Sequence, residues 1–330
     1  MSDAALRCLR QLREPFEERM TPWRITYGII LTILSIVSIF MNVNLTIVVL
    51  RNDTFNKSLR LYLLSATLAG LVGVIPLLLS LIPSIFFRVE LRDPENLIIS
   101  VADALSFLIF MLTTTIIALD RLLFFILPQV HGCLNSRKNI LSCLAALPVA
   151  ISVAAIIHMF TLGCYKRTDP YALAFTHSCS KCSGNYRPIL SYMGIICPAV
   201  NFGIYVIVFL RILAIRKEFR TRLRGAGSTK MDDILLIIQF ILICLSQFGS
   251  SGLLPLLTPY IYTITSFQMS TIFTAINTMI NPIVIFALQK RMRRTCFRFL
   301  KLSRSTNSTV VLPATNPSPH NTNSTNPGAP

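Results

Sequence analysis

Seven apolar runs dominate the 330-residue chain, and each is long enough to cross a membrane as a helix. The hydrocarbon core of a bilayer is about 30 Å thick, so a helix needs roughly 20 apolar residues to cross it. Only 14% of the residues are charged, against about a quarter in soluble domains. The sequence therefore predicts an all-α, polytopic membrane protein with a seven-transmembrane helix bundle. The predicted spans are Ile25–Leu50, Leu59–Phe87, Leu97–Leu127, Ile140–Leu162, Ile189–Leu213, Ile234–Leu257 and Ile264–Leu288.

The spans divide the chain into four predicted parts. An N-terminal segment (1–24) lacks the apolar h-region of a cleavable signal peptide, so the first span is expected to act as the targeting signal. The transmembrane domain (25–288) is followed by a basic segment (289–302), which predicts a short amphipathic eighth helix on the membrane surface. Cys296 in this segment is a palmitoylation candidate. The tail (303–330) is rich in Ser, Thr, Asn and Pro, as disordered segments are.

Basic residues gather on one side of the predicted membrane. Twenty of the 31 Lys and Arg residues lie on the C-terminal side, where the segment 216–224 is predicted to extend the fifth helix. The positive-inside rule then places the C-terminus in the cytoplasm and the N-terminus outside, in a multi-pass plasma-membrane protein. The net charge of +17 is distributed between spans, so it does not indicate a nucleic-acid partner. Four glycosylation tripeptides on the cytoplasmic side favour the opposite orientation. They begin at Asn52, Asn56, Asn307 and Asn323. Such tripeptides often arise by chance, so the charge distribution decides the predicted orientation.

A charged pair, Asp120 and Arg121, ends the third span, with Pro128 seven residues after the arginine. Charges are costly beside lipid, so the pair is expected to face the bundle or its cytoplasmic mouth. An alternative is an ordinary arginine that snorkels from a helix end to the interface. Asp232 or Asp233, at the start of the sixth span, is a possible resting partner of Arg121, although compensation of the helix dipole explains both acids more simply.

Other spans contain polar or proline landmarks. Asn281 precedes Pro282 in the seventh span. The proline removes a backbone donor and kinks the helix, and Asn281 can satisfy a carbonyl that the break frees. Proline kinks are also common in transporters. The first span contains Asn42, nine residues before Arg51, and the fifth contains Pro198.

The order and spacing of these landmarks resemble the rhodopsin-like (class A) G-protein-coupled receptors. Asp120–Leu122 is similar to the Asp-Arg-Tyr motif, and Leu122 takes the place of its tyrosine. Asn281 and Pro282 are similar to the Asn-Pro-x-x-Tyr motif, whose tyrosine is Ile285 here, and Asn42 is similar to the first-helix asparagine. The resemblance implies an arginine held by its neighbouring acid at rest and released to a heterotrimeric G protein. It also implies an extracellular ligand, with receptor kinase and arrestin as further partners.

The departures from that family are systematic. Gly70 stands at the second-helix aspartate, so the family's sodium site is not expected. No cysteine begins the third span, and the only tryptophan is Trp23. Such a profile resembles fast-diverging chemosensory receptors, notably the nematode serpentine classes. A chemosensory receptor is therefore predicted, and a polytopic transporter is the alternative. A transporter is expected to show paired halves or charges at mid-membrane, and an enzyme is expected to show clustered His, Asp, Glu or Cys. Neither pattern is evident in the sequence. No cofactor or metal is predicted.

Asp103 is the candidate ligand-binding residue. It lies eighteen residues, or five helical turns, before Arg121, so both share one face of the third span. A carboxylate within the membrane is a candidate functional group, and the resemblance implies a place where amine receptors hold a cationic ligand. The alternative is a carboxyl near the outer mouth that is hydrated or paired with a basic loop residue.

Three cysteines, Cys164, Cys179 and Cys182, lie in the loop after the fourth span. On the oxidising outer face Cys164 can pair with Cys179 or Cys182, or one of these cysteines with Cys8. Sequence alone does not choose between these pairings. A zinc site at Cys179 and Cys182 has little support, because His177 is the only other ligand nearby.

Overall fold

The computed structural model describes residues 2–13, 20–51, 57–136, 138–181, 186–222, 242, 245–248 and 264–288. The sixth predicted span (234–257) lies almost wholly outside these residues. The segments 289–302, with Cys296, and 303–330 also lie outside them. The other six predicted spans are confirmed as helices.

Six helices in the described part of the chain are long and apolar enough to cross a membrane. The second of them is continuous from Lys57 to Phe87, and Pro76, which lacks a backbone N–H, precedes its π-helical turn. α11 has the predicted bounds, whereas α2 begins three residues early and includes Arg24. The spanning elements are α2 (Pro22–Arg51), α3 (Lys57–Pro76) with η1 (Leu77–Leu81) and α4 (Ile82–Phe87), α5 (Glu95–Ile126), α7 (Lys138–Thr161), α8 (Tyr186–Arg222) and α11 (Ile264–Leu288).

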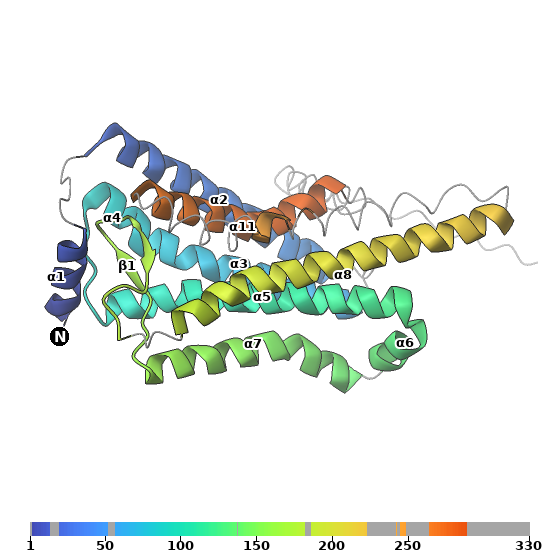
Figure 1. The fold of residues 1–330 in the computed structure, drawn as a ribbon. Coiled ribbons are helices and arrows are strands. Elements are labelled where there is room, and N and C mark those ends of the chain that lie inside the picture. Colours follow the sequence, from blue (N-terminus) through green and yellow to red (C-terminus); the bar gives the residue numbers. More distant parts are fainter. Residues whose placement is uncertain are drawn as a thin grey trace, which may run out of the picture.

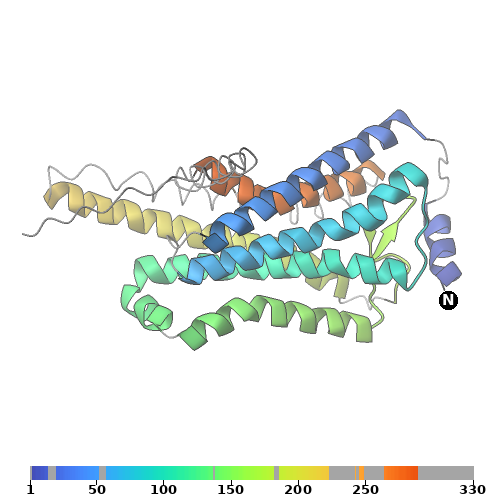
Figure 2. The ribbon, with the colours of Figure 1, turned by 180° about the vertical axis from the view of Figure 1, so that it is seen from behind.

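The long helices lie side by side in a bundle whose two ends differ (Figure 1, Figure 2). At one end, the hairpin end, lie α1 (Ser2–Leu12) and the antiparallel strands β1 (Arg167–Asp169) and β2 (Ala174–Thr176). At the other, the α6 end, lies α6 (Pro128–Ser136). α5 packs against α3, α7 and α8, and α2 packs against α3 and α11. The all-α class is confirmed, and α1, α6 and the hairpin are elements that sequence analysis did not predict.

The faces of α2 carry the pattern expected of a helix in lipid. Its buried face includes the polar residues Ser35, Ser38 and Asn42. Helices of soluble proteins bury apolar residues and expose polar ones, whereas polar groups in a membrane face the bundle interior. Large apolar residues at every third or fourth position are exposed instead: Ile29, Ile33, Ile36, Phe40, Val43 and Ile47.

Close helix packing depends on Gly73 in α3. A Cβ atom there would lie 3.1 Å from Cβ of Ser106 on α5, and closer still to its hydroxyl. That hydroxyl is buried and donates a hydrogen bond to the carbonyl of Ala69 at 2.7 Å. Small residues at helix interfaces let backbones approach closely in membranes, and here Gly73 permits the contact between α3 and α5.

Replacing Gly73 with alanine should therefore destabilise the bundle by about 2 kcal/mol through overpacking. The measurement is thermal unfolding of the purified protein in detergent. Gly203→Ala on α8 is the matched control, because no described residue lies within 4 Å of a Cβ atom at that position. Equal melting temperatures for the two variants would contradict the close contact.

Candidate functional site

The backbone carbonyl that Pro282 leaves without a donor in α11 is satisfied from α2. Pro282 has no N–H to donate to the carbonyl of Thr278, four residues earlier. Nδ2 of Asn42 donates to that carbonyl at 3.0 Å, and also to the carbonyl of Ser38 at 2.8 Å. The freed carbonyl is therefore satisfied by Asn42 rather than by Asn281, which was the sequence-based interpretation. Asn281 itself is buried.

Gly70 of α3 leaves room for this amide. A Cβ atom at Gly70 would lie 2.9 Å from Oδ1 of Asn42 and 3.1 Å from the carbonyl oxygen of Thr278. An aspartate at this position would therefore displace the contact. Ile285, in place of the motif tyrosine, is buried in an apolar cluster with side chains of α2 and α3 such as Leu45.

At the α6 end, the acid and the arginine of the charged motif have separate environments. Arg121 is buried, and its Nε has no hydrogen-bond partner among the described residues. An oxygen of Asp120 lies 3.3 Å from Nε2 of His131 on α6. The resemblance implied that Asp120 holds Arg121, whereas the structure pairs Asp120 with a loop helix. Asp232 and Asp233 lie outside the described residues.

The fold-back of α6 brings His131 to Asp120. α5 ends at Ile126, and Pro128 begins α6, a position that suits proline because the first turn needs no N–H there. His131 also packs edge-to-face on Phe124 of α5, with ring centroids 5.2 Å apart. Sequence analysis missed His131; the only signal was a histidine three residues after the loop proline.

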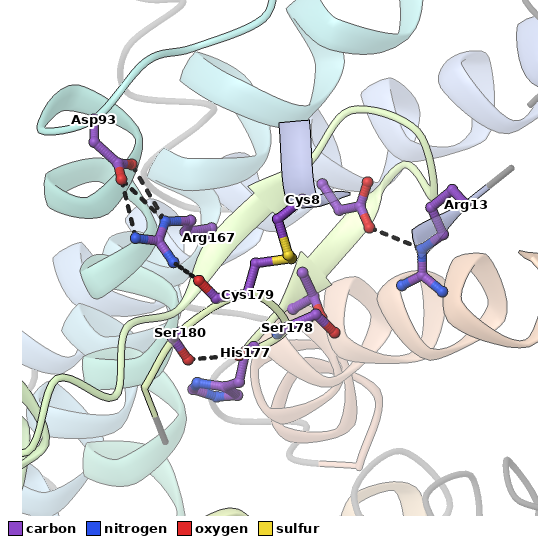
Figure 3. The surroundings of a disulfide bond; sticks show 10 residues. Cys8, Arg13, Asp93, Arg167, His177, Ser178, Cys179 and Ser180 are labelled. Atoms are coloured by element: carbon purple, nitrogen blue, oxygen red, sulfur yellow. Dashed lines mark hydrogen bonds and ion pairs between the residues drawn. A yellow bond between two sulfur atoms is a disulfide. The ribbon is translucent and has the colours of Figure 1, made fainter. Parts of the chain in front are cut away.

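Asp103, at the hairpin end of α5, is buried and forms an ion pair with Lys166 of the loop. This arrangement matches the alternative of a carboxyl paired with a basic loop residue. The neighbouring Arg167 forms an ion pair with Asp93, with Nη2 3.0 Å from Oδ2, and donates to the carbonyl of Cys179 at 3.1 Å (Figure 3). A cationic ligand at Asp103 would have to displace Lys166.

A disulfide between Cys8 and Cys179 ties α1 to the hairpin (Figure 3). Cys164 is disulfide-bonded too, and its pairing with Cys179 is excluded because Cys179 is already bonded. Cys182 lies outside the described residues. The zinc interpretation of Cys179 fails for the same reason, since its sulfur is not a free thiolate.

The remaining site predictions fall within described helices. Pro198 lies inside α8, and Leu122 packs against the apolar cluster that joins α3, α5, α7 and α8. Asp103 and Arg121 are both buried on α5, which agrees with their predicted common face. Their roles in ligand binding and coupling stay predictions.

Loss of the Asn42 amide should weaken the bundle. Asn42→Ala leaves the carbonyl of Thr278 without its donor, and interhelical hydrogen bonds in membranes are worth about 0.6 kcal/mol on average and up to about 1.7 kcal/mol. Asn44→Ala is the matched control, because the hydrogen bond of the Asn44 side chain within the described part of the chain stays inside α2, to the carbonyl of Phe40. Thermal unfolding in detergent should show a lower midpoint for Asn42→Ala than for Asn44→Ala, and the reverse order would refute the role of Asn42.

The chain matches a known family of receptors over most of its length. Residues 33–289, more than half of the chain, match the family described as serpentine type 7TM GPCR chemoreceptor Srx. The match includes Asn42, Asp120, Arg121 and Pro282. No curated protein matches the chain. The chain therefore belongs to the Srx family of serpentine seven-transmembrane G-protein-coupled chemoreceptors.

Proposed function

We propose that this chemosensory receptor lies in the plasma membrane with its hairpin end outside, and that it couples to a heterotrimeric G protein at its α6 end through Arg121. The family implies an extracellular ligand and G-protein coupling, and a transporter is not favoured. The observation that carries the proposal is the state of the charged motif. Asp120 pairs with His131, while Arg121 is buried beside it.

This arrangement describes a resting state. The Nε of Arg121 is buried and has no hydrogen-bond partner among the described residues, which costs free energy. A state in which a partner binds Arg121 is stabilised because that cost is removed. Movement of α6 away from α5 would release Asp120 and open the motif. A ligand that binds the open state more tightly shifts the population towards it.

Orientation is supported by charge. The α6 end includes the basic C-terminal extension of α8, which Figure 1 shows projecting beyond the other helices. The disulfide between Cys8 and Cys179 is at the opposite end. Disulfides persist in oxidising compartments such as the cell exterior, and basic loops are enriched on the cytoplasmic side of membrane proteins. Both features therefore favour the same orientation. Receptor kinase and arrestin stay predicted partners of the tail.

Asp103 stays a candidate ligand contact with one added condition. Because Lys166 already neutralises its carboxylate, a ligand would contact Asp103 only after the hairpin moves. In this proposal Asp103 has two roles: it holds the hairpin through Lys166, and it contacts the ligand once the hairpin has moved.

Releasing Asp120 should activate the receptor. His131→Ala is expected to raise ligand-independent nucleotide exchange on the G protein about fivefold, as the loss of about 1 kcal/mol from the resting state would do. Arg121→Ala in the same background should abolish the increase. The control is Cys133→Ala, an exposed position on α6. The mechanism is wrong if His131→Ala and Cys133→Ala give the same exchange rate at equal surface expression.

Topology is tested separately. An epitope placed before residue 2 should bind antibody on intact cells, and an epitope placed after residue 330 only on permeabilised cells. The opposite labelling would reverse the orientation and remove the α6 end from the cytoplasm.

A further inference from the structure

We propose that a pocket at the hairpin end binds a small organic acid through its carboxylate, a ligand class that deepens the receptor function proposed above and rests on the hairpin end being outside. The pocket has a volume of about 220 Å³. It lies where α1, α2, the end of α4 and the turn of the hairpin meet. The described residues that line it are Arg10, Arg24, Ser84, Arg88, Glu90, Pro170 and Tyr171.

Two guanidinium groups in the pocket lack acidic partners among the described residues. Arg24 and Arg88 form no ion pair there, and the acid of the described lining, Glu90, accepts a hydrogen bond from Tyr171. Several cations nearby at the hairpin end do have acidic partners: Lys166 pairs with Asp103, and Arg167 pairs with Asp93. Arg13 likewise pairs with Asp169, with Nε 3.0 Å from Oδ2. Unlike these three cations, Arg24 and Arg88 line a pocket together and can both receive an anion there.

Arg24 is the fixed centre of the pocket. It is only 6% exposed. Its Nε and Nη2 donate to the carbonyls of Ile85 and Ser84, at 3.0 and 2.7 Å. Nη1 has no hydrogen-bond partner among the described residues. The two bonds hold the guanidinium plane rigidly, so little side-chain entropy is lost when an oxyanion binds.

Arg88 supplies a second guanidinium from the rim. It follows the last residue of α4 in the left-handed conformation, with φ 55° and ψ 33°. Glycine is the usual residue at such a helix end, because other residues are strained there. Its side chain is exposed, and its guanidinium forms no hydrogen bond or ion pair within the described part of the chain. A carboxylate between Arg24 and Arg88 would receive charge-assisted hydrogen bonds from both.

Tyr171 and Glu90 form the opposite wall. The Tyr171 hydroxyl donates to an oxygen of Glu90 at 3.1 Å. Burial, and after it the Glu90 carboxylate, raise the pKa of the Tyr171 phenol, so this wall keeps a neutral phenol at physiological pH. A hydroxyl on the ligand can donate to Glu90, whereas a second carboxylate close to Glu90 would be repelled. The wall therefore orients the acid with its carboxylate towards the arginines.

The pocket also has the connections needed to report on binding. Pro170 and Tyr171 belong to the turn that joins β1 to β2, and Asp169 Oδ1 accepts the backbone N–H groups of Tyr171 and Ala172 at 3.0 Å each. The same hairpin carries Lys166 to Asp103 of α5. A ligand that bridges the hairpin turn to α2 and α4 would therefore bias the position of the loop lysine on the central helix.

The test uses the full-length receptor in nanodiscs of phosphatidylcholine, with 4-hydroxybutanoate as the probe and 4-hydroxybutanamide as its neutral counterpart. Binding is measured by calorimetry or by the shift in melting temperature. The acid is expected to bind and the amide to bind at least tenfold more weakly. Arg88→Gln should weaken binding of the acid about tenfold, which is the loss of about one charge-assisted hydrogen bond. Arg92→Gln, an exposed arginine of the same loop that does not line the pocket, should leave binding unchanged.

Equal binding of acid and amide, or equal effects of Arg88→Gln and Arg92→Gln, would overturn the proposal. Loss of binding when phosphatidylglycerol replaces part of the phosphatidylcholine would also overturn it, because the pocket would then belong to a lipid phosphate. Arg24→Gln can fail to fold, so the decision rests on the exposed Arg88. The assay needs no G protein. Absence of binding together with His131-dependent exchange would refute the anion site alone and leave the receptor mechanism standing.

Discussion

The hydrogen bond from Asn42 to the carbonyl of Thr278 is the contact on which the arrangement of α2, α3 and α11 depends. The hydrocarbon core of a bilayer offers no bulk water to a freed backbone carbonyl, so Pro282 is tolerated within α11 because another group satisfies the carbonyl of Thr278. Asn42 does so from α2. Gly70 of α3 has no side chain, which leaves space for the Asn42 amide to contact the carbonyl of Thr278. The first and seventh spans are thereby held in one register.

α5 carries two acidic residues, and each of them pairs with a basic residue at a different end of the bundle. Asp103 is held by Lys166 from the hairpin, and Asp120 by His131 from α6. Both partners come from loops rather than from other spans. α5 therefore connects the two loop contacts, and in the proposed mechanism a change in its position alters both. The disulfide from Cys8 to Cys179 extends the outer part of this system to α1.

Departures from the rhodopsin-like motifs have local physical explanations in this structure. Gly70 replaces an aspartate where a side chain would strike the Asn42 amide, and Ile285 replaces a tyrosine within an apolar cluster. These substitutions exchange polar contacts for close packing in the α2, α3 and α11 region. The rhodopsin-like class itself stays a prediction, whereas membership of the serpentine chemoreceptor family rests on a match over residues 33–289.

The sequence by itself determined the six spans that lie within the described residues, because the length of an apolar run is a local property set against a fixed bilayer thickness. It predicted a helix over the described residues of α11, and it named Asn42, Asp103, Arg121 and Pro282 as candidate functional residues. Their partners were decided only by the tertiary structure. Thr278 is 236 residues from Asn42, Lys166 is 63 from Asp103, and Cys179 is 171 from Cys8. Such pairings depend on how helices pack and loops fold back, and no local pattern of residues encodes that geometry.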